Sequence, residues 1–379
     1  MSVAFSESQS VQMLVPYLRL ARTEGIGSVS FRRLLERYQT PQAALEQLPF
    51  FKQKQFRIPS EAAIIKEIEG TFALSGKFLI WGQPGYPAAL AGLPDAPSIL
   101  TILGDATLLH RKMIAIVGAR NASAHGLRIA ESLSAEVASH QIGVISGLAR
   151  GIDQAAHRGA LFTSFTIAAI AGGIDKPYPQ ENAALQAQIA KQGVIITESP
   201  LGSAPKAIHF PRRNRLIAGL CWGCVVIEAA LHSGSLITAQ LALNYGKTVF
   251  AVPGSPLDPR NRGSNNLLRM GAVFTESAED ILSELPLEPP IKSVDKPITA
   301  DDFPLFKVES QSPKAVNEDK HATTLEEIIL GILSFTPTPI DEIVRSCNVS
   351  TAKVLSCLTE LELSGRILSQ LTGYSLAPH

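Results

Sequence analysis

A group of positive charges without acidic neighbours is the chemically most informative part of the sequence. Between Glu198 and Glu228 there is no acidic residue, but the interval holds four basic ones: Lys206, Arg212, Arg213 and Arg215. The segment HFPRRNRL places an aromatic ring and a proline that favours a helix start beside these arginines. A solvated helix face is the ordinary interpretation of clustered charge. Arginines at a helix start next to an aromatic ring instead predict contacts with the phosphates of a polyanion.

Glycine-containing turns follow the apolar runs between residues 111 and 285, and their composition suits an anion. Glycine lets backbone N–H groups approach a phosphate, and hydroxyl or amide side chains add hydrogen bonds. Several such turns along one sheet edge would form a groove for a polyanion. The residues that we predict to line this groove are Gly118, Arg120, Ser146, Gly147, Gly172, Gly173, Lys176, Gln180, Asn182, Phe210, Arg212, Arg213, Asn214, Arg215, Ser233, Gly234 and Ser235.

Motifs for nucleotide cofactors and metals are absent or incomplete. The first turn reads Gly118-Ala119-Arg120 and lacks the G-x-G-x-x-G pattern of dinucleotide sites, and no G-x-x-x-x-G-K-[ST] phosphate loop occurs. Asp153 and His157 stand four residues apart on a predicted helix. Without a further ligand, a helix cap and a structural histidine are favoured over a metal site. We therefore predict no metal and no cofactor.

Seven short apolar runs alternate with helix-length segments between residues 111 and 285. The runs are MIAIVG, GVISG, TIAAIAG, GVIITE, CVVIEA, VFAVPG and AVF. Continuous apolar runs are typical of strands buried on both faces of a parallel sheet, and the alternation predicts right-handed βαβ units. We predict an α/β fold, an extended Rossmann-like doubly wound parallel sheet, with the candidate turns at the carboxyl ends of its strands.

The rest of the sequence predicts two small domains and two connecting segments. Residues 11–75 indicate a small helical domain of the SAM or helix-hairpin-helix type. Its helices flank Gly25-Ile26-Gly27, for which we favour a packing role over phosphate contact. Residues 76–110 are rich in proline and glycine and predict a connector, and residues 286–321 predict a linker. Residues 322–379 predict three helices and a hairpin, which together form a winged-helix domain.

The predicted winged-helix domain has an acidic composition. Three basic residues, Arg345, Lys353 and Arg366, accompany six acidic ones: Glu326, Glu327, Asp341, Glu342, Glu360 and Glu362. This charge opposes contact with a phosphate backbone. We expect the domain to contact protein and to be dispensable for binding nucleic acid.

Composition restricts the class of protein and its compartment. The 379 residues exceed one average domain, and the 45% hydrophobic and 18% charged residues are typical of a globular chain. No apolar run is long enough for a membrane span, and the N-terminus lacks a secretory pattern. Cys221 and Cys224 have redox spacing, but their place next to a buried strand favours a structural role. Only four cysteines and the missing signal predict a cytoplasmic protein without disulfides.

The quoted segments resemble the DNA-processing protein A family, also called DprA or Smf. The matching segments occur in the family's order: GYPAALAGLPDAPSILTILGD, IAIVGAR, ISGLARGIDQAAHRGAL, AGGIDKPYPQEN, HFPRRNRLIAGL, IEAALHSGSLITA and AVPG. They span the whole predicted α/β domain. Arg120 matches the family's DNA-contacting arginine. Gln180 stands where many members have lysine, and Lys176 is the candidate replacement for that charge.

The resemblance implies a non-catalytic protein that binds single-stranded DNA in the groove at the sheet edge. It implies protection of incoming DNA and loading of the RecA recombinase in natural transformation. Single-strand-binding protein is a further implied partner, and a homodimer would form through the α/β domain. Bases would stack on Phe210 or on a guanidinium plane. No catalytic residue and no membrane contact are implied.

Two alternatives use the same fold. Nucleotide phosphoribohydrolases of the lysine-decarboxylase-like group carry a PGGxGTxxE loop with a catalytic glutamate, whereas the comparable stretch here reads EAALHSGSLITA. Glu228 is the first residue of this stretch and precedes its loop, and we expect it to order the backbone of the loop. The other alternative is a nucleotide-binding module without catalysis.

Overall fold

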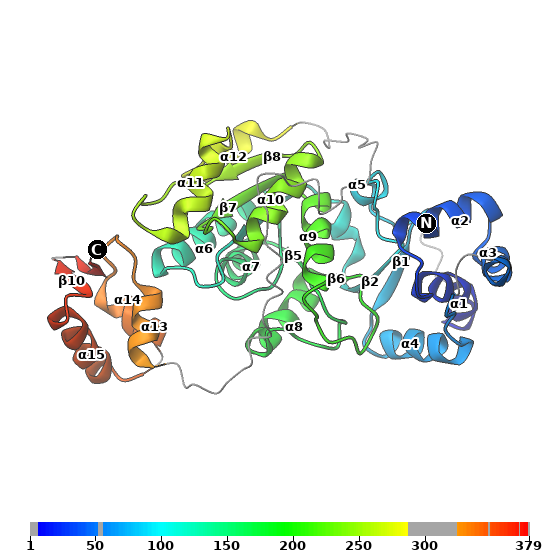
Figure 1. Ribbon diagram of the computed structural model, residues 1–379, viewed down its shortest axis with the longest axis horizontal. Helices are drawn as coiled ribbons and strands as arrows, with labels where there is room; N and C mark the ends of the chain where they lie inside the picture. Colours follow the sequence, from blue (N-terminus) through cyan, green and yellow to red (C-terminus); the bar gives the residue numbers. More distant parts are fainter. Residues whose placement is uncertain (1–6, 52–55, 287–323, 348, 371, 378–379) are drawn as a thin grey trace.

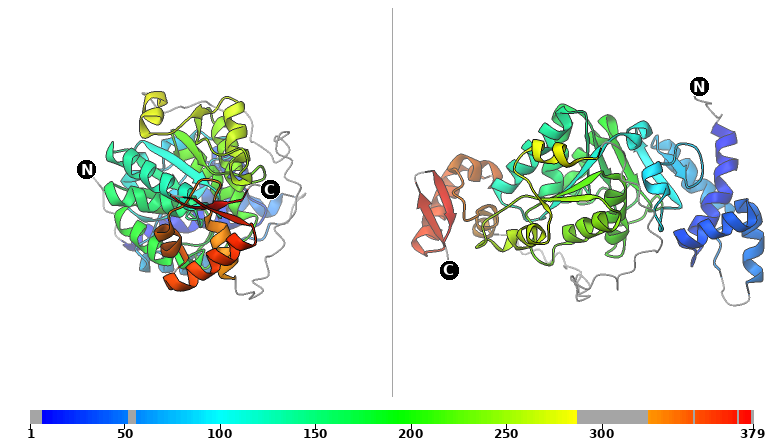
Figure 2. Two further views of the ribbon diagram at one scale, coloured as in Figure 1. Left: turned by 90° about the vertical axis from the view of Figure 1, so that its left-hand side faces the viewer. Right: turned by 90° about the horizontal axis from the view of Figure 1, so that it is seen from above.

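The computed structural model describes residues 7–51, 56–286, 324–347, 349–370 and 372–377. A central α/β domain lies between an N-terminal helical domain and a small C-terminal domain (Figure 1). The view from above shows the two small domains at opposite ends of the long axis (Figure 2). The predicted linker over 286–321 falls, apart from residue 286, outside the described residues.

The central sheet has the strand order β1-β2-β6-β5-β4-β3-β7-β8-β9 within the described residues. The strands from β6 to β9 in this order run parallel to their neighbours. They confirm the seven predicted runs: β3 (Met113–Gly118), β4 (Gly143–Ser146), β5 (Thr166–Ala169), β6 (Val194–Thr197), β7 (Gly223–Ile227), β8 (Thr248–Ala251) and β9 (Val273–Phe274). The strand order reverses between β3 and β7, and such a switch point is where open α/β sheets bind ligands.

Helices cover both faces of the sheet, as predicted for a doubly wound fold. One face packs against α6 (Ala124–Ser139), α7 (Ile152–Thr163), α8 (Ala183–Gln192) and α12 (Ala278–Glu284). The other packs against α5 (Ala88–Ala91), α9 (His209–Leu220), α10 (Gly234–Asn244) and α11 (Arg262–Arg269). Successive residues of β3 alternate between the two cores, with Ile114 and Ile116 in one and Ala115 and Val117 in the other.

Residues 76–110 do not form the expected connector, because they contribute two strands to the sheet. β1 (Lys77–Ile80) pairs with β2 (Ile99–Gly104), and β2 pairs with β6, both in antiparallel fashion. The prolines and glycines of this segment lie mainly between the strands, where they make turns and leave the ladders intact. The sheet is therefore mostly parallel with an antiparallel edge.

The N-terminal domain is helical, as predicted. It contains α1 (Glu7–Arg22), α2 (Ser28–Tyr38), α3 (Pro41–Gln47), the 3-10 helix η1 (Leu48–Phe50) and α4 (Glu61–Ala73). Their apolar residues form one core that also includes Ile80 of β1 and Ile99 of β2. Arg22 donates from NH1 to the backbone oxygen of Glu198 at 3.0 Å, and Arg32 donates to that of Leu93 at 3.0 Å. The helical domain is thus attached to the edge of the sheet by both apolar and polar contacts.

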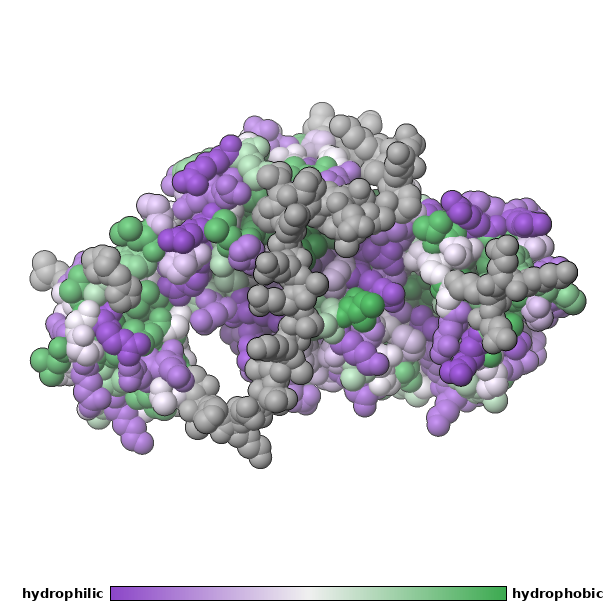
Figure 3. Space-filling model, in the orientation of Figure 1, coloured by the Kyte–Doolittle hydropathy of each residue, from purple (hydrophilic) through white to green (hydrophobic). Residues whose placement is uncertain are grey.

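The C-terminal domain has the predicted three helices and hairpin of a winged helix. These are α13 (Leu325–Ile332), α14 (Ile340–Cys347), α15 (Thr351–Leu363), β10 (Ile367–Gln370) and β11 (Gly373–Leu376). The domain has a separate apolar core around Ile329, Leu333, Ile343 and Leu358. On the face shown in Figure 3, hydrophilic residues predominate and hydrophobic residues form separate spots. No helix of the described residues is long and apolar enough to cross a membrane.

Candidate nucleic-acid interface

An aromatic ring with two arginines against it lies at the carboxyl edge of the sheet. Arg120 follows β3, and its Cζ lies 5.2 Å from the ring centroid of Phe210 at the start of α9. The Cζ of Arg213 lies 5.9 Å from the same centroid, and the ring of Tyr178 meets Phe210 edge-on with centroids 5.9 Å apart. Arg120 and Tyr178 are exposed. The group combines positive charge with a half-exposed ring, that of Tyr178, and such a combination binds unpaired nucleotides.

Arg213 is a buried cation with unused hydrogen-bonding capacity. It is 7% exposed, and its NH1 lies 3.6 Å from Oδ2 of Asp153. Burial lowers the pKa of Arg213, the carboxylate of Asp153 opposes this effect, and the charge of Arg120 adds to it. Its Nε has no hydrogen-bond partner among the described residues. Unpaired buried donors are costly and rare, and this Nε is itself buried, so Arg213 supports the ring of Phe210 and the neighbouring turn from beneath the edge.

The turn after β4 is shaped around Arg213. The carboxylate of Asp153 accepts hydrogen bonds from the N–H of Gly147 at 3.1 Å and of Ala149 at 3.4 Å. A Cβ on Gly147 would lie 1.0 Å from NH1 of Arg213, so only glycine leaves space for the guanidinium. Our expectation that Asp153 caps the following helix was wrong. The N-cap of α7 is Gly151, which has no side chain to cap the helix, and Asp153 ties the preceding turn instead.

His157 has the structural role that we expected. It is fully buried, its Nε2 accepts a hydrogen bond from the N–H of Leu148 at 3.3 Å, and its Nδ1 lies 2.7 Å from Oγ1 of Thr166. Burial, with a contribution from the charge of Arg213, lowers the pKa of His157 to about 3, so the ring is neutral. Leu148 itself has a φ of 54°, an unusual value for a side chain other than glycine. In the described part of the chain, no group of three metal-ligating side chains forms a site.

Glu228 fills the anion position at the switch point. Its carboxylate accepts hydrogen bonds from the N–H of Ser123, at 2.8 Å, and from the hydroxyl of Ser123. Glu228 is 7% exposed, and a Cβ on Gly126 would lie 2.5 Å from its Cδ. In a nucleotide-binding fold, a phosphate occupies this place at the start of the helix after the first strand. Glu228 thus orders the backbone at Ser123, in the turn after β3, whereas we expected it to order its own loop, and the carboxylate leaves little room for a nucleotide phosphate there.

Arg215 differs from the exposed Arg212, because two carboxylates already neutralise it. Its guanidinium forms ion pairs with Glu198 and with Asp95, where NH1 and Oδ2 are 3.1 Å apart, and it donates to Oγ of Ser28 in the helical domain at 3.3 Å. Burial acts to lower the pKa of Arg215, but Glu198 and then Asp95 outweigh burial and raise it. Its surroundings therefore indicate that Arg215 joins two domains.

The other predicted groove residues divide into exposed and buried groups. Exposed or half-exposed at the sheet edge are Gly118, Lys176, Gln180, Arg212, Ser233 and Gly234. Buried beneath them are Ser146, Gly172, Gly173, Asn182, Asn214 and Ser235. The buried members hold neighbouring turns together: Ser146 donates to the carbonyl of Ile116 at 2.6 Å, and Asn182 donates to that of Leu148 at 3.0 Å. We infer that the buried group positions the edge that the exposed group presents.

Two residues that contribute to the groove were not predicted from the sequence to do so. Tyr178 supplies a second ring at the edge and is 50% exposed. Asp153 orients Arg213 from the neighbouring turn. The KPYP segment shows an aromatic residue, Tyr178, in one of the candidate turns, but nothing in the local sequence shows that its ring contacts Phe210.

A cavity of about 810 Å³ continues the groove toward the helical domain. Residues 25–30 form one wall, and His209, Arg212 and Arg213 belong to the other. Burial lowers the pKa of His209, and the nearby charges of Arg212 and Lys206 lower it further. Arg212 forms no ion pair with any described residue. The glycine hairpin thus lies across a positively charged cleft from α9, and its contact with phosphate stays a prediction.

The cysteine pair belongs to the core, as expected. Cys221 and Cys224 are both fully buried and unpaired. Burial raises the pKa of Cys221 to about 12 and that of Cys224 well above its usual value. Both sulfurs are therefore thiols without the thiolate character of a redox site.

Comparison with known proteins shows the same domains. Family models match the chain as DNA recombination-mediator protein A over residues 77–286, as a DprA-like N-terminal HHH domain over 12–70 and as a DprA winged helix domain over 312–371. Protein Smf of Escherichia coli (strain K12) is 34% identical over 297 residues, which are 76% of this chain and 74% of that protein. DNA processing protein DprA of Bacillus subtilis (strain 168) is 43% identical over 203 residues, which are 53% of this chain and 68% of that protein.

Two solved structures are also similar. The X-ray structure of DNA processing protein A from Streptococcus pneumoniae has a TM-score of 0.63 and is 30% identical in sequence. The match covers 76% of this chain and 100% of that one. The structure of DNA processing protein A from Helicobacter pylori is described as showing a single-stranded DNA binding mode of that protein. It has a TM-score of 0.50 and 29% identity and covers 55% of this chain and 98% of that one. The chain therefore belongs to the DNA recombination-mediator protein A family, whose members are named DprA and Smf.

Proposed function

We propose that this protein binds single-stranded DNA without sequence preference in the groove formed by Arg120, Phe210, Arg212 and Arg213. The contact of Arg120 and Arg213 with the ring of Phe210 is the observation on which this proposal rests. The single-stranded DNA binding described for the Helicobacter pylori relative supports it. The DNA is held and not altered.

The chemistry of the groove favours single strands over duplex. Tyr178 offers a half-exposed ring and Arg120 a guanidinium plane over Phe210, and only unpaired bases can leave their own stack to use them. Arginine and lysine side chains at the same edge contact phosphates, which all sequences share. Affinity should therefore depend strongly on salt and weakly on sequence.

The absence of catalysis is part of the proposal. Glu228 is the carboxylate nearest to the loop that carries a catalytic glutamate in phosphoribohydrolases, and it is buried and bonded to Ser123. We expect no free base when the protein is incubated with nucleoside monophosphates. Release of base at enzymatic rates would favour the phosphoribohydrolase alternative.

Fluorescence anisotropy with one labelled oligonucleotide, as a single strand and as a duplex, tests the proposal. We expect tighter binding of the single strand. The logarithm of the binding constant should fall linearly with the logarithm of the salt concentration, and this salt slope should be about 0.7 per phosphate neutralised. Arg120→Ala should weaken binding and reduce the slope by about 0.7. Arg158→Ala is the matched control, because Arg158 is an exposed arginine on α7 outside the groove. Equal affinity for duplex and single strand would contradict the proposal.

Holding DNA is useful when another protein takes the strand over. We propose that this protein protects incoming DNA during natural transformation in the cytoplasm and loads the RecA recombinase on strands coated by single-strand-binding protein. RecA ATPase activity on coated DNA should rise faster in its presence, and Arg120→Ala should remove the effect. A protein that binds DNA but leaves RecA unaffected would be better described as a protector of incoming strands.

A further inference from the structure

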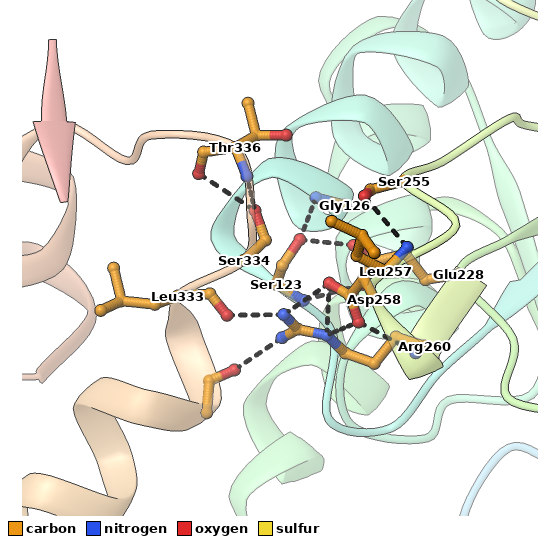
Figure 4. A network of polar contacts seen from close by, with 11 residues as sticks. Ser123, Gly126, Glu228, Ser255, Leu257, Asp258, Arg260, Leu333, Ser334 and Thr336 are labelled. Carbon is orange, nitrogen blue, oxygen red and sulfur yellow. Dashed lines mark hydrogen bonds and ion pairs between the residues drawn. The ribbon is translucent and has the colours of Figure 1, made fainter. Parts of the chain in front are cut away.

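The winged-helix domain contacts the carboxyl edge of the sheet through Arg260 (Figure 4). Arg260 lies in the 3-10 helix η4 (Pro259–Asn261) after β8, and its guanidinium forms a two-fold ion pair with Asp258, with NH2 2.8 Å from Oδ2. The remaining donors point to the end of α13. NH1 donates to the carbonyl of Gly331 at 3.0 Å, and NH2 donates to that of Leu333 at 2.5 Å.

A second arginine of the central domain meets the same small domain. Nε of Arg128, on α6, lies 3.2 Å from Oε1 of Glu342 on α14. A Cβ on Gly331 would lie 3.3 Å from Oδ1 of Asn121, the residue after Arg120. The winged-helix domain is therefore docked directly beside the proposed DNA groove.

The winged-helix domain contacts these arginines with negatively charged or partly negative oxygen atoms, as an anion would. Carbonyl oxygens at a helix C-terminus carry partial negative charge, and Glu342 adds a full one. A phosphate oxygen would accept the same hydrogen bonds from the same guanidinium groups. Arg128 and Arg260 both belong to the edge that holds Arg120, one on the helix after β3 and one after β8. Docking thus engages two cations that would lengthen the groove: the side chain of Arg260 is 15% exposed, and that of Arg128 is 55% exposed but has its Nε against Glu342.

The contact has the features of a reversible one. It rests on two arginines, and exposed or partly exposed polar contacts of this kind are individually weak. A cavity of about 120 Å³ separates residues 334–336 from Ser123 and Glu228, so the two domains are not packed together as one core. Ser334 and Thr336 line this cavity, and the N–H of Thr336 donates a hydrogen bond to Oγ of Ser334 at 3.1 Å (Figure 4).

We propose that the docked winged-helix domain masks Arg128 and Arg260, and that its release extends the DNA-binding groove past Arg120 by these two phosphate contacts. The inference rests on the proposed function, since it concerns the same groove. It also gives Glu342 of this acidic domain a role. The winged-helix domain competes with phosphates for the arginines of its own chain.

A reversible cross-link in the full chain tests the proposal. Asn121→Cys with Gly331→Cys places two cysteines across the contact, because a Cβ on Gly331 lies 3.9 Å from Cγ of Asn121. Cys357 is replaced by serine, since it is the native cysteine with partial exposure among the described residues. Oxidation should lock the domain in place, and a reductant should release it. The reduced protein is the matched control for the locked one.

We expect the locked protein to bind a long single strand about tenfold more weakly than the reduced protein. Its salt slope should be smaller by about 0.7, which corresponds to the one phosphate that Arg128 would neutralise, because Arg260 keeps its ion pair with Asp258 in both states. Arg128→Ala and Arg260→Ala should each weaken binding in the reduced protein and have a smaller effect in the locked one, where Glu342 and the carbonyls of Gly331 and Leu333 occupy their donors. A cross-link that does not form, or equal binding by both states, would overturn the inference.

Arg120→Ala separates this inference from the proposed function. If Arg120→Ala has no effect in either state, the groove itself is wrong. If Arg120→Ala weakens binding in both states but the lock changes nothing, the groove stands and the masking by the winged-helix domain is refuted.

Discussion

Three arginines of α9 have different surroundings, although the sequence presents them as one cluster. Arg212 is exposed, Arg213 is buried beside Asp153, and Arg215 is paired with Glu198 and Asp95. The sequence predicted that positive charge gathers here, because no acidic residue lies nearby along the chain. It could not predict which charge is already neutralised. The carboxylates that pair with Arg213 and Arg215 arrive from other turns through the sheet topology.

This difference predicts opposite effects of two substitutions. Arg215→Ala should lower the free energy of unfolding by about 3 kcal/mol, because it leaves two partly buried carboxylates without their partner. It should leave the salt slope of DNA binding unchanged. Arg212→Ala should do the reverse, with a slope smaller by about 0.7 and little change in stability. Urea unfolding and anisotropy titrations measure both quantities. A reduced slope for Arg215→Ala with unchanged stability would show that Arg215 contacts DNA.

His157 makes stability depend on pH in a definite direction. Its folded-state pKa of about 3 lies below the usual value of 6.5, so below pH 6.5 the unfolded chain binds a proton that the folded chain does not. The free energy of unfolding should therefore fall as pH falls from about 6.5 toward 3, by up to about 1.4 kcal/mol per pH unit from this group. His157→Gln should be less stable at pH 7.5 but show a shallower decline. Identical pH profiles for the two proteins would contradict a neutral, buried His157.

At the scale of elements, the positions of the turns could be predicted from the sequence, but the roles of their glycines could not. Apolar runs that alternate with helix-length segments predicted every parallel strand and the edge at which the turns meet. The role of individual glycines was different from expectation. Gly147 makes space for a side chain from α9, whereas we expected it to admit a phosphate to the backbone. A partner so distant in sequence leaves no local pattern.

Gly147→Ala should act through Arg213. The added methyl group overlaps NH1, so the guanidinium must leave Asp153 and the ring of Phe210. We expect DNA affinity to fall about tenfold and the free energy of unfolding to fall by roughly 1–3 kcal/mol. A double-mutant cycle provides the control. In an Arg213→Ala background, Gly147→Ala should cost little more in affinity, and additive losses would contradict this coupling.

The two antiparallel strands were missed for an equally physical reason. β1 and β2 are short apolar runs inside a segment rich in proline and glycine, and the composition of the whole segment outweighed the runs. β2 gains its stability from pairing with β6, which comes much later in the chain. Only the completed sheet identifies this edge, so the local sequence predicted a connector.

For the whole molecule, the two ends of the sheet differ in how they are covered. At β1, Ile80 belongs to the core of the helical domain. At the other end, β9 is an edge strand with one neighbour among the described strands; Phe274 of β9 is 52% exposed, and Met270, shortly before it, is 45% exposed. An uncovered edge with exposed apolar side chains is a common site of association. We therefore place the predicted homodimer contact of the α/β domain at β9.

A dimer with two grooves predicts how affinity depends on the length of the DNA. A strand long enough to reach both grooves binds the second one at high effective concentration, which can raise affinity by about 10²–10⁴ without new contacts. Affinity should therefore step upward at one length. Met270→Ser with Phe274→Ser should give monomers in sedimentation and remove the step, while binding of short strands stays the same. Phe162→Ser is the matched control, because Phe162 is 88% exposed on α7 away from β9. A step that persists in a monomeric variant would mean that one groove alone, extended by the cleft beside α2, accounts for the length dependence.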